Sequence, residues 1–170
     1  MSVSVSEHPN GGALLHGKRM LVTGASAGIG RAIALTAARH GAAVALNYFG
    51  DPAGAGSAVT EITANGGRAI AVEGDVADPF TASKCVDACV AEFGAIDILV
   101  SNAGICPFHS LLDIPVETVR RTVDVNLLGS YYMVQAAARQ MVAQGNGGSI
   151  IAISSISALV GGAMQTHYTP

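Results

Sequence analysis

Short apolar runs alternate with longer segments of helical period along most of this chain. The apolar runs RMLVTG, AAVALNY, RAIAVEGDV, IDILVSNAG and GNGGSIIAISS begin at residues 19, 42, 68, 96 and 145. Polar alternation within them is slight, as expected for strands that are covered on both faces. Strands that alternate with helices in this way predict a parallel sheet with right-handed crossovers.

Glycine and proline punctuate the segments between the runs. Segments 54–64 and 79–93 are expected to be helices, the second with Pro79 near its start and Gly94 past its end. In the segment that begins at Ile29, the residues Ile29, Ile33 and Ala37 fall on one helical face, and Gly41 suits the position after the last turn. One long helix is expected over 116–141. The fold class is therefore α/β, a doubly wound Rossmann-type parallel sheet with helices on both faces.

Charge and cysteine content exclude several classes of protein. The net charge is −3 with a pI of about 5.9 and no basic run, so no nucleic-acid partner is expected. The three cysteines make no disulfide framework and fit a reducing compartment. Cys85 and Cys89 are spaced like two metal ligands on a helix, but nothing nearby completes a site, and we expect them to pack in the core.

From the sequence we expect neither a membrane-spanning segment nor a signal peptide. No run is long and apolar enough to span a bilayer, and the N-terminus lacks the pattern of a signal peptide. We expect residues 1–17 to be a disordered tail, residues 18–170 to form one dinucleotide-binding domain, and the protein to be cytoplasmic.

The stretch TGASAGIG, residues 23–30, joins the first predicted strand to the first predicted helix. Its glycines, Gly24, Gly28 and Gly30, permit a tight turn and allow backbone amides to approach a pyrophosphate at the helix N-terminus. We expect Ser26, Ala27 and Ile29 to contact the same phosphates. At this position in a strand–helix–strand pattern, the motif predicts a dinucleotide cofactor.

The end of the second strand usually decides between NAD and NADP. A carboxylate there accepts from a ribose 2′-hydroxyl, and a basic side chain there pairs with a 2′-phosphate. This chain offers Asn47, followed by Tyr48, and position 27 in the loop is Ala. We expect Asn47 to contact the ribose, and the sequence leaves NAD and NADP both open.

Six motifs in order give the chain a family resemblance: TGASAGIG, GDV at 74–76, SNAG at 101–104, VNLLG at 125–129, ISS at 153–155 and Tyr168. Together they resemble the short-chain dehydrogenase/reductase family. The resemblance implies that Asp75 and Val76 bind the adenine, and that the following residues line the rest of the cofactor: Asn102, Ala103, Gly104, Val125 and Tyr168. An acidic residue just after a strand also suits a helix N-cap, but Asp78 is the better placed cap for the next helix.

The same resemblance implies a catalytic set of Asn126, Ser155 and Tyr168. Oxidation of a hydroxyl requires removal of its proton while hydride leaves the carbon, and a tyrosine can act as that base while a serine orients the substrate oxygen. In the family, the asparagine distorts its helix locally and anchors a water.

The stretches NAGICPFHSLLDIP and GGSIIAISSISALVGGAMQTHYTP resemble those family members that oxidise the anomeric C1 hydroxyl of L-rhamnose to a lactone with NAD or NADP. We expect Ser155, Ser157, Gln165 and Tyr168 to contact the sugar. The alternatives are a dehydrogenase or reductase of this family for another sugar, polyol or ketone, and a non-catalytic dinucleotide-binding fragment. His109 and His167 are not expected to form a metal site.

The family places a lysine four residues after its tyrosine, which would be position 172 here. The lysine and the last strands of the sheet therefore lie beyond the sequence given, and we expect the chain alone to be insoluble or inactive. The full-length enzyme is expected to be a homo-oligomer.

Overall fold

Five parallel strands form one sheet in the computed structural model, which describes residues 13–169. The strands are β1 (Arg19–Val22), β2 (Ala43–Tyr48), β3 (Arg68–Glu73), β4 (Ile98–Ser101) and β5 (Ser149–Ala152). Their order across the sheet is β3-β2-β1-β4-β5, and each neighbouring pair is parallel. The chain therefore winds outward from β1 in both directions, which confirms the doubly wound fold.

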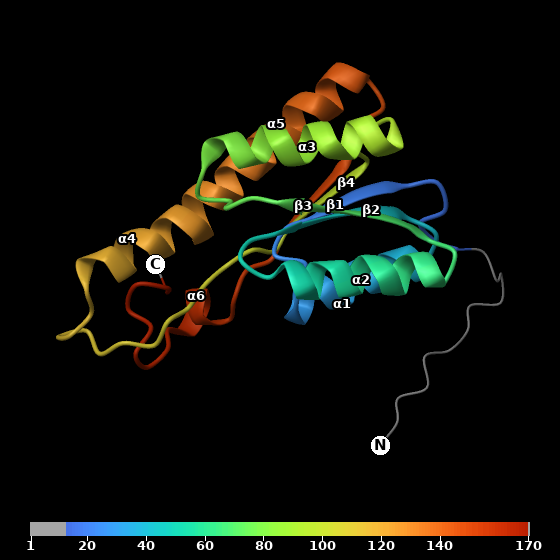
Figure 1. Ribbon diagram of the computed structural model, residues 1–170. Coiled ribbons are helices and arrows are strands. Elements are labelled where there is room, and N and C mark those ends of the chain that lie inside the picture. The colour runs from blue at the N-terminus through green and yellow to red at the C-terminus, as the bar shows by residue number, and fades with distance from the viewer. Residues whose placement is uncertain (1–12, 170) are drawn as a thin grey trace.

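Helices cover both faces of the sheet (Figure 1). They are α1 (Gly28–Arg39), α2 (Pro52–Ala64), α3 (Pro79–Phe93), α4 (Val116–Val123), α5 (Ser130–Gln144) and the short α6 (Ser157–Val160). One core cluster joins the sheet to α1 and α2, and a second joins it to α3 and α5. The sheet is thus the middle of three layers, as expected for strands that are apolar on both faces.

Side-chain caps set the starts of α2 and α3. Asp51 accepts a hydrogen bond from the Gly54 amide at 3.0 Å, and Asp78 accepts one from the Phe80 amide at 3.0 Å. Each cap is followed at once by a proline, which suits the first helical position. The cap at Asp51 explains why α2 begins at Pro52, two residues before the start at residue 54 that the sequence predicted.

The predicted inner face of α1 is wrong at Ile29, which is 65% exposed. A Cβ atom on Gly30 would collide with the Gly24 carbonyl, so it is Gly30 that turns toward the sheet. This close approach fixes the rotation of the helix, and Ala34, Leu35 and Ala37 follow on the buried side. Ile29 therefore points away from the core at the start of the helix.

The first described residues form a turn, whereas the sequence predicted disorder through residue 17. The Leu15 amide donates to the His40 carbonyl at 2.9 Å, and the Lys18 amide donates to the Leu15 carbonyl at 2.9 Å. The turn thus packs against the end of α1, and the ordered domain begins before residue 18. Residues 1–12, the rest of the predicted tail, lie outside the described residues.

Within residues 13–169, no helix is long and apolar enough to cross a membrane.

Cys85 and Cys89 lie in the core between α3 and the sheet, with no exposed surface. Burial raises the pKa of each thiol to about 12. Cys106 is half-buried. The predicted packing role of the two core cysteines agrees with their buried position.

The raised pKa values predict slow thiol chemistry. At pH 8 both core cysteines are protonated as well as buried, so an aromatic disulfide reagent should titrate one thiol, Cys106, in the native chain and all three in urea. A Cys106→Ser variant should show no fast thiol. Rapid labelling of two or more thiols in the native chain would contradict the buried placement.

Strand β5 has a partner on one side only in the described part of the chain. Its four residues are all exposed, among them Ile150 and Ile151, which point to opposite faces of the sheet. An apolar strand with an unpaired edge is a template for pairing with another chain.

We expect Ile151→Lys to reduce self-association of the chain, because Ile151 is 47% exposed and a charge on an edge strand opposes pairing. Sedimentation velocity at matched concentration measures the effect. The control is Ile151→Val, which keeps an apolar edge and should leave the aggregated fraction unchanged. If both variants self-associated to the same extent, the edge of β5 would not be the surface through which the chains associate.

Candidate active site

The glycine-rich loop makes a tight turn between β1 and α1. Gly24 and Gly28 have φ values of +61° and +54°, which favour glycine. A Cβ atom on Gly24 would lie 2.9 Å from the Ala103 Cα, whereas one on Gly28 would meet nothing within 4 Å. Gly24 therefore serves close packing of β1 on β4, and Gly28 leaves open space at the start of the helix.

The N-terminus of α1 is free to receive an anion. Ala27 precedes the helix in extended conformation and provides no side-chain cap, and the first turn has no acidic residue. By contrast, aspartates cap α2 and α3. Unpaired amides at a helix N-terminus attract phosphate, so the loop and α1 fit the pyrophosphate of a dinucleotide.

Thr23, which the sequence analysis passed over, ties the end of β1 to the end of β4. Its hydroxyl accepts hydrogen bonds from the Asn102 and Ala103 amides, both at 2.9 Å. The Asn102 side chain donates in return to the Thr23 carbonyl at 2.9 Å. The sequence did contain a sign of this role. Thr23 is a polar residue at the end of an apolar run, and a buried hydroxyl in that position needs hydrogen-bond partners. The segment of Asn102, Ala103 and Gly104 thereby sits beside the glycine-rich loop.

The expectation that Asn47 contacts the cofactor ribose is wrong. Asn47 is 1% exposed, and its amide nitrogen donates to the Val72 carbonyl at 3.3 Å and to the Gly74 carbonyl at 2.9 Å. The side chain thus faces the interior, where it holds β3 beside β2. Tyr48 and Phe49 are the residues of this strand end that retain exposed surface.

Asp75 lies just beyond β3, and its carboxylate has two protein partners. One oxygen accepts from the Ala77 amide at 3.0 Å, and the other lies 2.7 Å from the Arg121 Nη1 atom. Asp78 caps α3, as predicted, so Asp75 is not the cap. The neighbouring Val76 is buried and packs closely against Gly129. A Cβ atom on Gly129 would lie only 2.8 Å from a methyl group of Val76.

The long predicted helix is interrupted by η1 (Asp124–Gly129), a π-helical turn between α4 and α5. Asn126 lies in this turn and pairs with the backbone of Ile105, whose amide donates to Oδ1 at 2.8 Å and whose carbonyl accepts from Nδ2 at 2.9 Å. Asn126 is therefore not a solvent-facing helix residue. Val125 is buried beside it. The turn holds the loop after β4 against the helix.

Three hydrogen bonds connect the four residues predicted to contact substrate. The Ser157 amide donates to Ser155 Oγ at 3.2 Å, and Ser157 Oγ donates to Gln165 Oε1 at 3.0 Å. The Tyr168 amide then donates to the Gln165 carbonyl at 2.9 Å. These four residues, which lie within 13 positions of one another, form what we call the Ser–Gln–Tyr cluster, and Tyr168 is linked to it through its backbone.

The two histidines near this cluster do not share a metal site in the described residues. The His109 amide donates to the Met164 carbonyl at 3.0 Å, so the loop before α4 contacts the loop after α6. His167 is buried, and neither ring nitrogen has a hydrogen-bond partner within the described residues.

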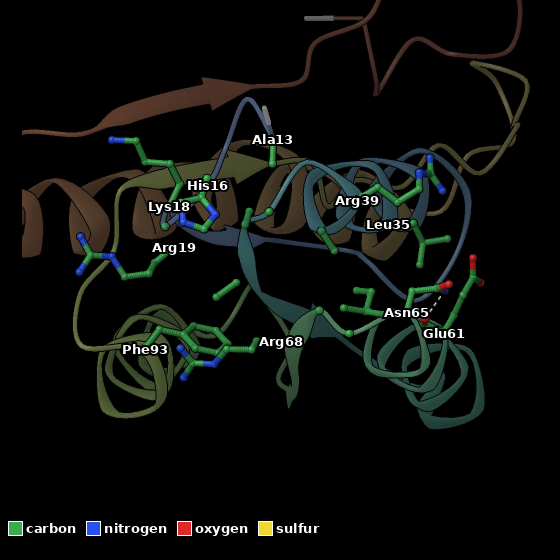
Figure 2. A pocket seen from close by; sticks show the side chains of 18 residues that line it. Ala13, His16, Lys18, Arg19, Leu35, Arg39, Glu61, Asn65, Arg68 and Phe93 are labelled. Atoms are coloured by element: carbon green, nitrogen blue, oxygen red, sulfur yellow. Dashed lines mark hydrogen bonds between the residues drawn. The ribbon is translucent and has the colours of Figure 1, made fainter. Parts of the chain in front are cut away.

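A groove of about 830 Å³ lies at the opposite edge of the sheet, at the amino ends of the strands (Figure 2). None of the predicted site residues lines it. Its basic residues include Lys18, Arg39 and Arg68, and α1, α2 and α3 end beside it. Cations at helix C-termini compensate the helix dipoles, which accounts for them without a ligand. In doubly wound sheets ligands bind at the carboxyl ends of the strands.

The fold and the loop define a dinucleotide-binding α/β domain, and comparison with known proteins gives its family. The sequence pattern described as short chain dehydrogenase matches residues 18–170. The chain belongs to the short-chain dehydrogenase family.

Among curated relatives, the L-rhamnose 1-dehydrogenase (NAD(P)(+)) of Sphingomonas sp. (strain SKA58) is 66% identical over 157 residues. The enzyme of the same name from Azotobacter vinelandii is 59% identical over 160 residues. Each alignment covers 92% of this chain and 62% of the relative, so the chain spans less than two thirds of their length.

A solved structure of a short-chain dehydrogenase from Burkholderia cenocepacia J2315 in complex with NADP is 42% identical, with a TM-score of 0.86. That alignment covers 91% of this chain and 62% of the other.

We expect Thr23→Val to lower the free energy of unfolding by about 3 kcal/mol, because two buried amides lose their acceptor. Urea unfolding followed by circular dichroism measures this change. Thr23→Ser is the matched control: it keeps the hydroxyl and should lose about 1 kcal/mol with the methyl group. Equal stability of the two variants would show that the hydroxyl does not hold the strand ends.

Proposed function

We propose that the full-length protein oxidises the anomeric hydroxyl of L-rhamnose to a lactone and transfers the hydride to NAD⁺ or NADP⁺. The observation that carries the proposal is the Ser–Gln–Tyr cluster, in which side-chain hydrogen bonds link the expected catalytic Ser155 to Ser157 and Gln165, and a backbone hydrogen bond links Gln165 to Tyr168. Neutral amide and hydroxyl groups of this kind suit the hydroxyls of a sugar. Relatives that are 66% and 59% identical carry the name L-rhamnose 1-dehydrogenase.

In the proposed reaction, Tyr168 acts in its deprotonated form, and the tyrosinate oxygen takes the proton of the anomeric hydroxyl and becomes the phenol hydroxyl. Ser155 orients the same substrate oxygen by a hydrogen bond, and Ser157 and Gln165 contact the neighbouring hydroxyls. The nicotinamide ring supplies the acceptor for the hydride, which carries both electrons of the oxidation. Asn126 holds the loop after β4 through both backbone groups of Ile105.

The surroundings of the adenosine end support use of both cofactors. Beyond β2 the ribose would meet Tyr48 and Phe49, and the loop offers Ala27. The last residue of β2 is therefore neither a carboxylate that repels a 2′-phosphate nor a base that requires one. Both curated relatives are named for NAD(P)(+), which agrees with this neutrality.

We propose further that the full-length enzyme is cytoplasmic and assembles as a homo-oligomer. The described cysteines are free thiols, as in a reducing compartment. Tyr131 and Val142 leave apolar surface exposed on α5, which suits a helix–helix interface.

The sharpest test compares the 170-residue chain with a chimera that joins it to the remaining C-terminal segment of the Sphingomonas relative. The chimera should reduce NAD⁺ and NADP⁺ in the presence of L-rhamnose and form a lactone visible by NMR. We expect no turnover by the chain alone. The chimera is also tested with another sugar, with a polyol and, in the presence of reduced cofactor, with a ketone. Preference for one of these would overturn the L-rhamnose assignment, and cofactor binding by the chimera without turnover would indicate a non-catalytic module.

In the chimera, Tyr168→Phe should lower the rate of L-rhamnose oxidation by about 100-fold or more, because the general base is removed. Binding of NADP⁺, measured by calorimetry, should change by less than about twofold, since the ring is kept. Thr166→Ala, an exposed neighbour, serves as the matched control and should keep full activity. Retained activity in Tyr168→Phe would exclude the tyrosine as the base.

A further inference from the structure

Phe49 and Asp75 lie side by side at the ligand edge of the sheet. Phe49 follows β2, Asp75 follows β3 by two residues, and the last residues of these strands, Tyr48 and Glu73, are register partners. Beyond them the Gly74 amide donates to the Tyr48 carbonyl at 2.9 Å, which holds the two segments together. In such folds the adenosine half of a dinucleotide binds at these strand ends.

Arg121, in the last turn of α4, contacts both residues. Its Nη1 atom lies 2.7 Å from an Asp75 oxygen, and its guanidinium carbon lies 5.9 Å from the centre of the Phe49 ring. The second Asp75 oxygen accepts from the Ala77 amide, so the carboxylate is held from two sides. In Figure 1, α4 lies beyond the carboxyl ends of the strands, where it can reach across this edge.

Stability does not account for this arrangement. The side chains of Arg121 and Asp75 are 41% and 25% exposed, and ion pairs with this much solvent contact stabilise a fold only slightly. Phe49 is 63% exposed although a cation lies over one face of its ring. An exposed aromatic ring beside an oriented carboxylate offers a stacking surface and a hydrogen-bond acceptor, the two features that bind an adenine ring with its amino group.

The neighbouring segment connects this cluster to the phosphate site. A Cβ atom on Gly54, in the first turn of α2, would lie 2.8 Å from the Ser26 carbonyl, so the chain after Phe49 passes directly beside the glycine-rich loop. A dinucleotide with its pyrophosphate at that loop would extend its adenosine toward Phe49 and Asp75.

We propose that Phe49 and Arg121 form the outer wall of the adenine subsite, and that Arg121 is the residue that positions the Asp75 carboxylate toward the adenine amino group. This inference rests on the proposed use of a dinucleotide. Asp75 already neutralises the charge of the Arg121 guanidinium. Phe49 and Arg121 therefore contribute to binding of the adenine ring, which NAD and NADP share, and not to binding of the 2′-phosphate.

The test measures binding of 5′-AMP, 5′-IMP, NAD⁺ and NADP⁺ to the 170-residue chain by calorimetry. Every protein in the comparison carries Ile151→Lys for solubility, and the chain with this change alone is called the unsubstituted chain. The change lies on β5, at the opposite edge of the sheet from β3, so it is remote from the proposed subsite. Phe49→Ala should weaken 5′-AMP and 5′-IMP by the same factor, about tenfold, through lost stacking. Arg121→Gln should weaken 5′-AMP, NAD⁺ and NADP⁺ equally, by about tenfold, because a charge-assisted contact that orients Asp75 is removed.

5′-IMP separates positioning from a general loss of structure. It carries a carbonyl where adenine has its amino group, so the unsubstituted chain should prefer 5′-AMP and Arg121→Gln should reduce that preference. Phe49→Trp, which keeps an aromatic face, should restore binding. The matched control is Arg120→Gln: Arg120 is the adjacent exposed arginine, has no ion pair in the part of the chain that the structure describes, and should leave all affinities unchanged.

Three outcomes would overturn the inference. Arg121→Gln could bind every nucleotide like Arg120→Gln, it could lose affinity for NADP⁺ alone, or it could keep the preference for 5′-AMP over 5′-IMP. In each of these cases the proposed cofactor use still stands. If the unsubstituted chain bound none of the four nucleotides, the proposed dinucleotide function would fail together with the inference.

Discussion

The hydroxyl of Thr23 holds the ligand edge of the sheet in place. Beyond the last ladder bond between β1 and β4, the amides of Asn102 and Ala103 would lack partners, and this one oxygen accepts from both. Because the two strand ends are fixed, Gly24 can turn against Ala103, and Gly30 can pack on the Gly24 carbonyl. The orientation of α1, and with it the direction of its free amides, follows from that packing.

Asn47 and Asn126 play the same part at other points of this edge. Asn47 satisfies two backbone carbonyls at the end of β3, those of Val72 and Gly74, and Asn126 satisfies both backbone groups of Ile105. Buried backbone groups without partners are costly, so a polar side chain is required wherever a parallel ladder ends under cover. These residues build the frame of the site, while the groups free to bind a ligand are the uncapped amides of α1 and the side chains around Asp75.

Local signals in the sequence predicted the frame of this fold well. Apolar runs identified all five strands, and Asp78, Pro79 and Gly94 marked the ends of α3 as the structure has them. The predictions failed where an orientation depends on distant residues. Asn47 was expected to contact the ribose, but its side chain bonds instead to Val72 and Gly74, which lie 25 or more residues away in the sequence. Ile29 fitted an apolar helical face, yet the approach of Gly30 to Gly24 rotates the helix away from it.

Different interactions hold the two halves of the site, the cofactor half and the Ser–Gln–Tyr cluster. The cofactor half rests on strand ends and backbone hydrogen bonds, so its geometry is fixed by the same interactions that fix the sheet. The Ser–Gln–Tyr cluster lies instead on turns around the four-residue helix α6, and the bond between Ser157 and Gln165 joins two side chains. Ile156, Leu159 and Val160 around it are exposed. Reorienting one side chain of the cluster costs far less free energy than moving the end of a strand, because it changes only one rotamer and one hydrogen bond. Changes of substrate within such a frame can therefore arise in this segment while the cofactor half stays the same, because the side-chain hydrogen bonds of the cluster involve none of the residues that fix the strand ends.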